Sequence, residues 1–504
     1  MSAYNHGVYV RESGTSLIPT LEVPTAVSFV VGTAPVNLVT NPTVNEAVMV
    51  TTYEEAVAAF GLAMPVEDAN GLKHFDYTLS EFIYGHFQTY ANVPVTLVNV
   101  LDPARHRKAI TTTSVDVTAG IATVAERGIL PDTVKLAHVV PGVDGASDQV
   151  TEYTKDVDYT LSFDSDGNLV IGILKGNDGA FKVSGVVTIT GFKLDPTAVT
   201  SADIIGGVDA VTGKNKGLEC IGDVYPKYGI VPTLILAPGF SEDVEVALLM
   251  SAKALQINGN FNALALIDAP TSGAVIKYSD VPNWKNLNGL SATNQIVLWP
   301  NVVQGKTIYH ASTHMAGIIA RTDYTNDGFP HCSPSNKTAN ITGLCLSDGA
   351  EVILGMEKVN YLNGQGVCSF TNFGGSWRAW GNRTAAYPSS TDPKDTFIPV
   401  RRMFHWVGNT IVQTLWQKVD EPGNRRLIDS VKDSLNQWLN SLSKGDQILG
   451  GRVEFLEVDN PTTALMDGKY TFRVYLTPPS PAEELVFDLS IDTAYYKNLF
   501  SIEG

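Results

Sequence analysis

Two histidines placed four residues apart could share one face of a helix and bind a metal ion together. They lie in the densest polar cluster of the chain, residues 310–336, which contains His310, His314, Asp323, His331 and Cys332. A zinc site needs three or four ligands at set spacing, and no carboxylate or third ligand stands at such a spacing here. We therefore interpret the histidines as helix-capping and loop residues beside a contact with another subunit, and we predict no metal and no cofactor.

Nucleotide binding and hydrolysis each need a motif that the chain does not complete. Residues 305–307 (Gly-Lys-Thr) resemble the end of a phosphate-binding loop, but Pro300 stands five residues before Gly305, where such a loop needs glycine. No GxSxG or HExxH sequence occurs, so no nucleophile–base pair is indicated. An α/β enzyme that uses the two histidines and Asp323 for hydrolysis is an alternative, but we predict that the protein is not an enzyme.

Three oxygen-bearing side chains, Asp164, Asp166 and Asn168, resemble part of a calcium-binding loop. The glycine and the distal glutamate of that loop are not in their required places. The flanking residues 159–163 and 169–173 alternate between apolar and polar. This pattern favours a β-hairpin whose turn contains the acidic residues.

Aromatic and basic residues interleave in GGSWRAWGNRT, residues 374–384, where Trp377 and Trp380 alternate with Arg378 and Arg383. Aromatic residues together with arginine are enriched in protein interfaces. These four residues are a candidate interface between subunits. The alternative is a strand at a sheet edge with two tryptophans in the core.

An α/β core must position these residues. Residues 25–101 form its first part and residues 206–396 its second part. In the first part we predict a buried strand over 25–35, a helix over 52–61 with Thr52 as N-cap and Gly61 as stop, an amphipathic helix over 79–90 and a β-branched strand over 93–100. In the second part we predict strands over 230–240, 261–270 and 294–303, a helix over 241–256 capped by Ser241 and a helix over 311–323. This order favours a partly parallel sheet.

Between the two parts, residues 102–205 consist of short alternating runs split by turn signals, so they predict an inserted β-rich domain at the periphery. Residues 397–480 predict a C-terminal α+β unit. One helix covers 400–417, with Phe404, Val407, Ile411 and Leu415 at helical spacing. A second covers 424–442, and its inward residues are Leu427, Ile428, Val431, Leu435, Trp438, Leu439 and Leu442. The strands cover 451–460 and 469–480.

Both ends of the chain contain alternating segments that lack a local partner strand. Residues 1–24 form an N-terminal arm with Val8 and Val10 on one face, and residues 481–504 form a C-terminal strand arm with Leu485, Phe487, Leu489 and Ile491 on one face. A strand with an apolar face needs a partner. The predicted fold is therefore a multidomain α/β (α+β) protein: a mixed-sheet core, an inserted all-β domain and extended terminal strand arms.

Composition narrows the functional classes. The 504 residues are 44% hydrophobic and 17% charged, which is typical of globular proteins. The net charge of −17 argues against direct binding to nucleic acid or an anionic membrane. The first residues lack the apolar region of a signal peptide, and no apolar run approaches the roughly 20 residues needed to span a bilayer. We expect a protein that is made and assembled in a cytoplasm.

Several blocks, in order, resemble contractile tail sheath proteins, the family of phage tails, phage-tail-like bacteriocins and contractile injection systems. The blocks are HGVYVRES with VPTAVSFVVGTAP, the segment 206–243, MAGIIARTDYTNDGFPHCSPSNKTANITGL, YLNGQGVCSF, GGSWRAWGNRT and FIPVRRMFHWVGNTI. The resemblance covers residues 1–100 and 206–504, and leaves 102–205 outside.

The resemblance implies a structural subunit that polymerises as stacked hexameric rings in a helical assembly around an inner tail tube. Its terminal arms would add strands to the sheets of neighbouring copies. Contraction would drive the tube through a bacterial envelope, as in viral genome ejection. The implied partners are the chain itself, the inner tube protein, and baseplate and tail terminator proteins, in a virion tail or phage-tail-like particle assembled in the host cytoplasm. Another self-assembling tubular protein is a further alternative.

The family also implies that the C-terminal domain lies innermost. The helix over 424–444 has four basic and two acidic residues, in contrast to the acidic whole. Arg425, Arg426 and Lys432 are therefore candidate tube-facing residues. An ordinary solvated helix face is the alternative.

Overall fold

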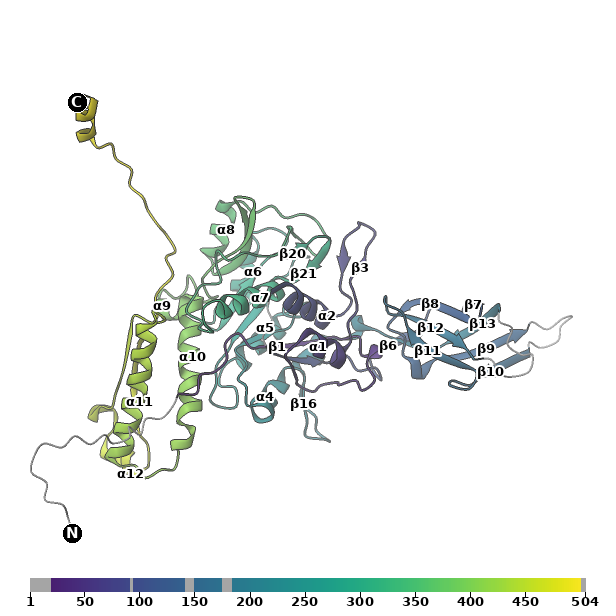
Figure 1. Cartoon of the computed structure of the whole chain (residues 1–504), viewed down its shortest axis with the longest axis horizontal. Helices are drawn as coiled ribbons and strands as arrows, with labels where there is room; N and C mark the ends of the chain where they lie inside the picture. The colour runs from purple at the N-terminus through teal and green to yellow at the C-terminus, as the bar shows by residue number, and fades with distance from the viewer. Residues whose placement is uncertain (1–19, 91–93, 141–148, 175–183, 500–504) are drawn as a thin grey trace, which may run out of the picture.

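The computed structural model describes residues 20–90, 94–140, 149–174 and 184–499. Figure 1 shows an elongated molecule with a mixed α/β body in the middle, a separate β-sheet at one end and the C-terminal helices at the other. Within these residues, no helix combines the length and the apolar character that crossing a membrane requires.

The body is organised around an eight-stranded mixed sheet. Its strands are, in spatial order, β2 (Val48–Val50), β5 (Val95–Asn99), β1 (Ser28–Gly32), β17 (Leu234–Leu236), β18 (Leu264–Asp268), β19 (Gln295–Leu298), β23 (Val367–Phe373) and β24 (Ser376–Trp380). Neighbours from β5 to β23 run parallel, and the two edge strands are antiparallel to their partners. Every residue of β5, β1, β17 and β18 is buried, as expected for parallel strands covered on both faces. The prediction of a partly parallel sheet is confirmed.

Helices cover this sheet. The helix α1 (Tyr53–Phe60) is bounded as predicted, because the Thr52 hydroxyl accepts a bond from the Glu55 N–H at 3.2 Å and Gly61 ends it with φ 73°. The helix α2 (Thr78–Ile83) continues as a π-helix, η2 (Tyr84–Tyr90). The other helices of the body are α3 (Ser201–Ile205), α4 (Ile221–Tyr228), α5 (Val244–Lys253), α6 (Val281–Leu287), α7 (Ala311–Tyr324), α8 (Met356–Asn363) and α9 (Pro393–Thr396).

The predicted cap of α5 is wrong. Asp243 is the N-cap and accepts a bond from the Glu245 N–H at 2.9 Å. Ser241 is buried instead, where its hydroxyl accepts a bond from the Asp268 N–H at 3.0 Å and donates to the Asp268 carboxylate at 3.3 Å. A buried carboxylate needs hydrogen-bond donors. The Ser241 hydroxyl serves the Asp268 carboxylate and therefore does not cap the helix.

The single strand predicted over 294–303 is two strands in two sheets. After β19 the chain passes Trp299 and Pro300 and enters a five-stranded sheet, in the order β22 (Gly343–Cys345), β20 (Asn301–Gln304), β21 (Thr307–Tyr309), β4 (Lys73–His74) and β3 (Val66–Glu67). Pro300 has no N–H to donate to a ladder, so one strand cannot run through it at the centre of a sheet.

A seven-stranded antiparallel sheet lies between β5 and α3 in the sequence. Its order is β10 (Gln149–Tyr153), β9 (Lys135–Val140), β13 (Ser184–Thr190), β7 (Ser114–Thr118), β8 (Ile121–Arg127), β12 (Asn168–Ile173) and β11 (Tyr159–Phe163). It has a hydrophobic cluster of its own, which includes Val124, Leu136 and Ile171. The short strands β6 (Arg107–Ala109) and β14 (Phe192–Leu194) pair at its base. The predicted hairpin is confirmed: β11 pairs with β12, and the Asp164 carboxylate accepts bonds from the N–H groups of Asp166 and Asn168.

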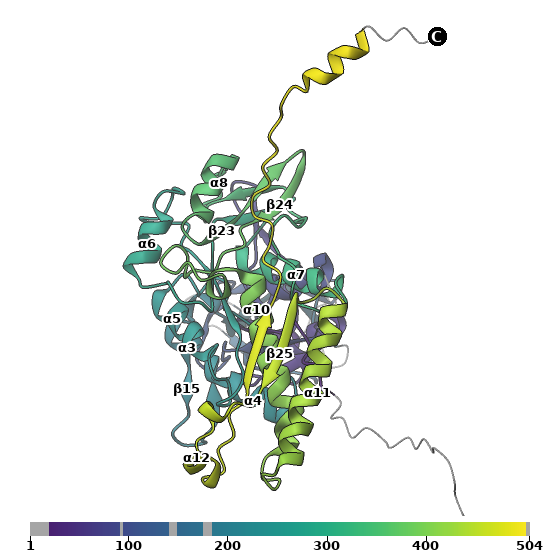
Figure 2. The same ribbon diagram turned by 90° about the vertical axis from the view of Figure 1, so that its left-hand side faces the viewer.

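The C-terminal unit contains α10 (Ile398–Leu415), α11 (Arg425–Lys444), β25 (Gly450–Glu454), α12 (Thr462–Met466) and β26 (Arg473–Thr477). Figure 2 shows β25 between β26 and α11. The predicted apolar face of α10 is confirmed in part: Val407 is buried and the half-buried Ile411 and Leu415 pack against the core, whereas Phe404 is half-buried. Polar Arg402, Asn409, Thr410 and Thr414 are buried as well, because each finds a hydrogen-bond partner elsewhere in the body.

Candidate interaction surface

The C-terminal segment 484–492 is extended and exposed. Leu485, Phe487, Leu489 and Ile491 are between 72% and 92% exposed, and the segment is not part of any sheet among the described residues. It runs away from the body and ends in a short 3₁₀ helix, η8 (Thr493–Leu499) (Figure 2). Exposed apolar surface of this extent is typical of a segment that binds another molecule.

The residues that lead into this segment, 478–483, are attached to the body and are called the root of the arm below. Pro478 is buried, and the Glu483 carboxylate forms a two-pronged ion pair with Arg383, whose Nε lies 3.1 Å from Oε1. Beyond Glu483, no hydrogen bond or ion pair joins the described part of the arm to the body; the bonds at Ala494 and Tyr495 are internal to it. The exposed arm therefore begins after Glu483.

The two-stranded sheet of β25 and β26 directly precedes this root in the sequence. The strands are antiparallel, with Gly450 opposite Thr477 and Glu454 opposite Arg473. Within the described residues, no further strand pairs with either of them. A two-stranded sheet has two edges, and each edge displays backbone groups that another chain can bind.

One of these edges is blocked. Asn436 of α11 donates from its amide to the Val453 carbonyl at 3.1 Å and accepts from the Val453 N–H at 2.8 Å. The side chain of Asn436 thus occupies the ladder positions at the middle of β25. The edge of β26 has no such cap among the described residues, so β26 presents the edge that is free to accept a strand.

The predicted N-terminal arm is only partly described, and Val8 and Val10 lie outside the described residues. Its last residues are docked onto the C-terminal helices. The Leu21 N–H donates to the Thr414 hydroxyl at 3.0 Å, and the Val23 carbonyl accepts from the Trp406 indole at 2.9 Å. The Trp438 indole donates to the Glu22 carboxylate at 3.0 Å. Residues 21–23 therefore belong to the folded body.

The four residues of the predicted aromatic–arginine interface all make contacts within this chain. Trp377 and Trp380 are half-buried, and the Trp380 indole donates to Asn360 at 3.1 Å. Arg378 donates to the Asn336 carbonyl at 3.0 Å. Residues 336–339 also bond to the backbone of β24 and cover its outer edge. Contacts within one chain test neither the subunit interface nor its alternative, a strand at a sheet edge with two tryptophans in the core, so both stay predictions.

Three of the four basic residues of α11 lie near its start, and the fourth, Lys444, ends the helix. Arg425 is exposed and lies 3.5 Å from Asp429, which is also 3.5 Å from Lys432. Arg426 is exposed as well. Val431, Leu435, Trp438, Leu439 and Leu442 form the buried face of the same helix, so these cations lie on surface that a partner could reach.

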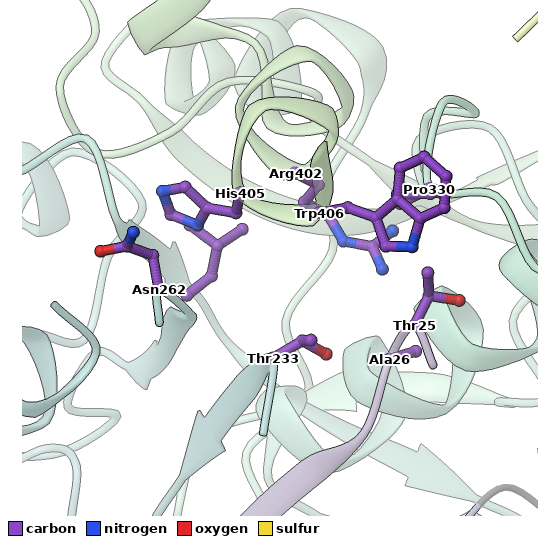
Figure 3. A pocket seen from close by; sticks show the side chains of 9 residues that line it. Thr25, Ala26, Thr233, Asn262, Pro330, Arg402, His405 and Trp406 are labelled. Atoms are coloured by element: carbon purple, nitrogen blue, oxygen red, sulfur yellow. The ribbon is translucent and has the colours of Figure 1, made fainter. Parts of the chain in front are cut away.

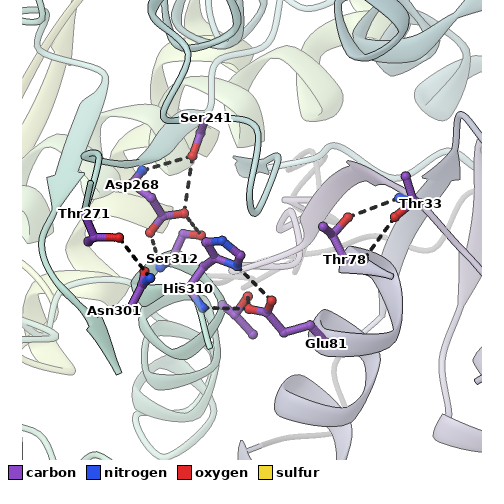
Figure 4. Close-up of polar contacts among 10 residues, drawn as sticks. Thr33, Thr78, Glu81, Ser241, Asp268, Thr271, Asn301, His310 and Ser312 are labelled. Carbon is purple, nitrogen blue, oxygen red and sulfur yellow. Dashed lines mark hydrogen bonds and ion pairs between the residues drawn. The ribbon is translucent and has the colours of Figure 1, made fainter. Parts of the chain in front are cut away.

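A polar cluster fills the carboxyl ends of β1, β17 and β18 (Figure 4). The Glu81 carboxylate accepts bonds from the His310 N–H and from Nδ1 of its ring, each at 2.8 Å. Asp268 accepts from the Ser312 N–H at 2.8 Å and from the Ser312 hydroxyl. In open parallel sheets this edge commonly binds ligands, but here protein side chains occupy it and bond to one another.

Electrostatics explain why the cluster is stable. Burial alone would lower the pKa of His310, but the carboxylates of Glu81, Asp268 and Glu242 outweigh it and raise that pKa to about 10. Burial raises the pKa of Glu242 to about 7, partly offset by His310. An imidazolium enclosed by carboxylates is a structural ion pair, because no free imidazole base remains.

The other residues of the predicted polar cluster have separate partners. Nδ1 of His314 lies 2.7 Å from the Tyr90 hydroxyl, and burial lowers the pKa of His314 to about 4. The Asp323 carboxylate forms a buried two-pronged pair with Arg402 of α10. Within the described part of the chain, no three His, Cys, Asp or Glu side chains are arranged to hold a metal.

A cavity lies at the opposite ends of the strands (Figure 3). Thr25, Thr233, Asn262, Arg402, His405 and Trp406 contribute to its lining. It offers only about 20 Å³ to a water-sized molecule, which is roughly the space that one water needs. This cavity is too small for a substrate.

Sequence reasoning missed Glu81, Asp268, Asn436 and Glu483. Glu81 had no signal, because helical spacing places it opposite the apolar face of Leu79, Phe82 and Ile83; only packing around α2 buries it. Asn436 and Glu483 had none, because their partners are distant in the sequence.

The chain is similar to several proteins of contractile machines, although no family model matches it. It is 28% identical over 510 residues to a tail sheath protein of Burkholderia phage BcepMu, and the alignment covers 98% of both chains. In fold it resembles the sheath complex of an extracellular contractile injection system in its contracted state, at TM-score 0.55, 13% identity, and 98% and 99% coverage. It also resembles a chain of the anti-feeding prophage baseplate, at TM-score 0.55, 17% identity, and 97% and 100% coverage.

Proposed function

Because the chain belongs to the contractile tail sheath family, we propose that it is the structural subunit that polymerises around the inner tube of such a tail. The observation that supports this most directly is the exposed apolar arm over 484–492. An isolated enzyme has no use for such a segment, whereas a polymer can bury it in the next copy.

The proposed assembly step is strand exchange between copies. The arm pairs with a sheet of a neighbour, and its apolar face becomes buried there. Burial of its four apolar side chains contributes about 1.5–3 kcal/mol each, while ordering eight residues costs roughly 1–2 kcal/mol each. The two totals are similar, so the strand is stable only where the backbone bonds of a neighbouring sheet are added.

The proposed acceptor is the open edge of β26. Asn436 blocks the opposite edge of the same sheet. Arg452 of β25 and Arg473 of β26 are exposed and pair with Glu454 and Asp459. Asp488 and Asp492 lie on the polar face of the arm. Opposite charges on adjacent strands favour pairing, so the acidic arm suits this sheet.

The body is proposed to move as one unit during contraction. One hydrophobic cluster is continuous from Val23 through the eight-stranded sheet to Val453 of β25, so the body and the C-terminal unit share a core. During contraction the rigid bodies change their contacts while the arms stay paired. The arms could therefore link stacked hexameric rings in the extended and the contracted state. The free energy released per copy is summed over many copies, so contraction requires no nucleotide.

The remaining proposals concern partners and location. Arg425, Arg426 and Lys432 face the inner tube, and the seven-stranded sheet at the far end of the molecule (Figure 1) points outward. Baseplate and tail terminator proteins bind the ends of the polymer. The particle is a phage tail or a phage-tail-like particle assembled in the host cytoplasm, and contraction drives the tube through a bacterial envelope.

Truncation after Pro481 tests this function. We expect the full chain to form long striated cylinders in negative-stain electron microscopy and the truncated chain to form none. Both chains should unfold at the same urea concentration, because the removed residues make few contacts with the body. Intact cylinders from the truncated chain, or a defined small oligomer from the full chain, would contradict the proposal.

A further inference from the structure

The arm leaves the body at one defined residue. Glu483 is bound by Arg383 through Nε and Nη2, whereas the adjacent Glu484 has no recorded hydrogen bond or ion pair within the described chain. The two residues have the same charge and differ by one position. The body therefore binds the carboxylate of Glu483 and leaves that of Glu484 unbound.

The binding site for Glu483 is built into the body. The Arg383 guanidinium lies 3.7 Å from the ring centre of Phe397 and 4.6 Å from that of Tyr387. Its Nη1 donates to the Thr396 hydroxyl at 3.0 Å. The Arg383 side chain is only 15% exposed. Stacked between rings and bonded to a hydroxyl, the guanidinium points its remaining donors at the carboxylate, in the fork geometry that suits two-pronged binding.

The backbone around this site is also fixed. Arg383 and Phe397 form an antiparallel bridge, and the Thr384 N–H donates to the Thr396 carbonyl at 2.8 Å. Figure 1 shows the arm departing beside α9, which Thr396 ends. The site thus lies where the α/β body meets α10.

We propose that Arg383 is a positioning residue for strand exchange: it holds Glu483 of its own chain and fixes where the exchange strand leaves the body. The inference rests on the proposed function and deepens it. The exchange strand begins at Glu484, and eight residues from there to Ile491 span roughly 26 Å. An acceptor edge on the neighbour must lie within that reach. A fixed root also raises the effective concentration of the arm at the acceptor.

The first test uses the isolated full chain. Spin labels are attached to cysteines introduced at Gln437 on α11 and Ala482 in the arm, with Cys332 changed to Ser. We expect one narrow distance distribution. Glu483→Gln and Arg383→Lys should each abolish the narrow peak, because neither preserves a two-pronged charged pair. Glu484→Gln is the matched control and should leave the peak unchanged.

The second test measures assembly of the same variants. A free root lowers the effective concentration of the arm, so Glu483→Gln should raise the protein concentration needed for cylinders by roughly three- to tenfold. Glu484→Gln should not. A narrow peak that persists in Glu483→Gln would overturn the inference, and so would assembly at an unchanged concentration. Since the distance measurement needs no polymer, failure of the positioning role is distinguishable from failure of strand exchange.

Discussion

The strand β5 and the C-terminal arm are both extended, apolar segments, but the molecule treats them in opposite ways. Every residue of β5 is fully buried between β2 and β1. The apolar residues of the arm are between 72% and 92% exposed. The arm carries acidic residues that β5 lacks, but both have apolar side chains to bury, and only β5 has neighbouring strands among the described residues. The body completes its own sheet, and the arm has to find one elsewhere.

This difference separates the residues that stabilise the fold from those that are proposed to drive assembly. In the body, polar groups such as Glu81, Asp268 and His310 bond to one another, and residues 336–339 cover the edge of β24. Within the described residues, the arm has no partner strand, and β26 has none on its outer edge. Stability and assembly are therefore carried by different residues and can be changed separately.

The largest effect on assembly is expected from substitutions in the arm. Phe487→Ser combined with Leu489→Ser should prevent cylinder formation at any concentration up to 100 times the normal one, because each lost side chain removes about 1.5–3 kcal/mol per copy. The urea midpoint of the isolated chain should not change. Val486→Ser, on the opposite face of the arm, is the control, and it should still form cylinders. Normal assembly of the serine variant would remove the arm from the contact.

A substitution at a buried ion pair of the body should lower the stability of the fold, which the arm variant leaves unchanged. Arg402→Met leaves the buried Asp323 without its partner and should destabilise the fold by about 3–5 kcal/mol in urea unfolding. Arg425→Met, which breaks an exposed pair, should cost less than about 0.5 kcal/mol. The double variant Asp323→Leu with Arg402→Met should recover much of the loss. Equal effects of the two single arginine variants would refute the contrast between buried and exposed pairs.

The His310 cluster predicts a pH dependence confined to the body. The pKa of His310 is about 10 when folded, against about 6.5 when unfolded. A raised pKa stabilises the fold fully below pH 6.5, and this contribution is lost as pH rises toward 10. The urea unfolding energy should therefore fall by a few kcal/mol over that window relative to its course in His310→Gln. Parallel curves for the two proteins would mean that His310 is not charged in the fold.

The smallest effect on stability is expected on α11. Arg425→Glu with Arg426→Glu should change the unfolding energy by less than about 0.5 kcal/mol, because both side chains are exposed. It should nevertheless reduce assembly on the purified inner tube. Lys469→Gln, at an exposed cation outside α11, serves as the control. Unaltered sheathed tubes from the double variant would rule out the tube-facing role.

Some local features were predictable because neighbouring residues determine them. The helix between Thr52 and Gly61 is one example, since its cap and its stop are both adjacent to it. The inward face of α11 is another. The cap of α5 was mispredicted, because Ser241 binds the carboxylate of Asp268, which is distant in the sequence. The buried polar residues of α10 were not foreseen, because Arg402 binds the equally distant Asp323.

The sequence by itself determined the mixed α/β character, the hairpin at Asp164 and an apolar C-terminal segment with no local partner, because periodicity and turn chemistry are local properties. Only the tertiary structure decided that Asn436 closes one edge of the last sheet and that Arg383 holds Glu483, 100 residues away. Such contacts depend on how elements pack, and no spacing along the chain encodes them.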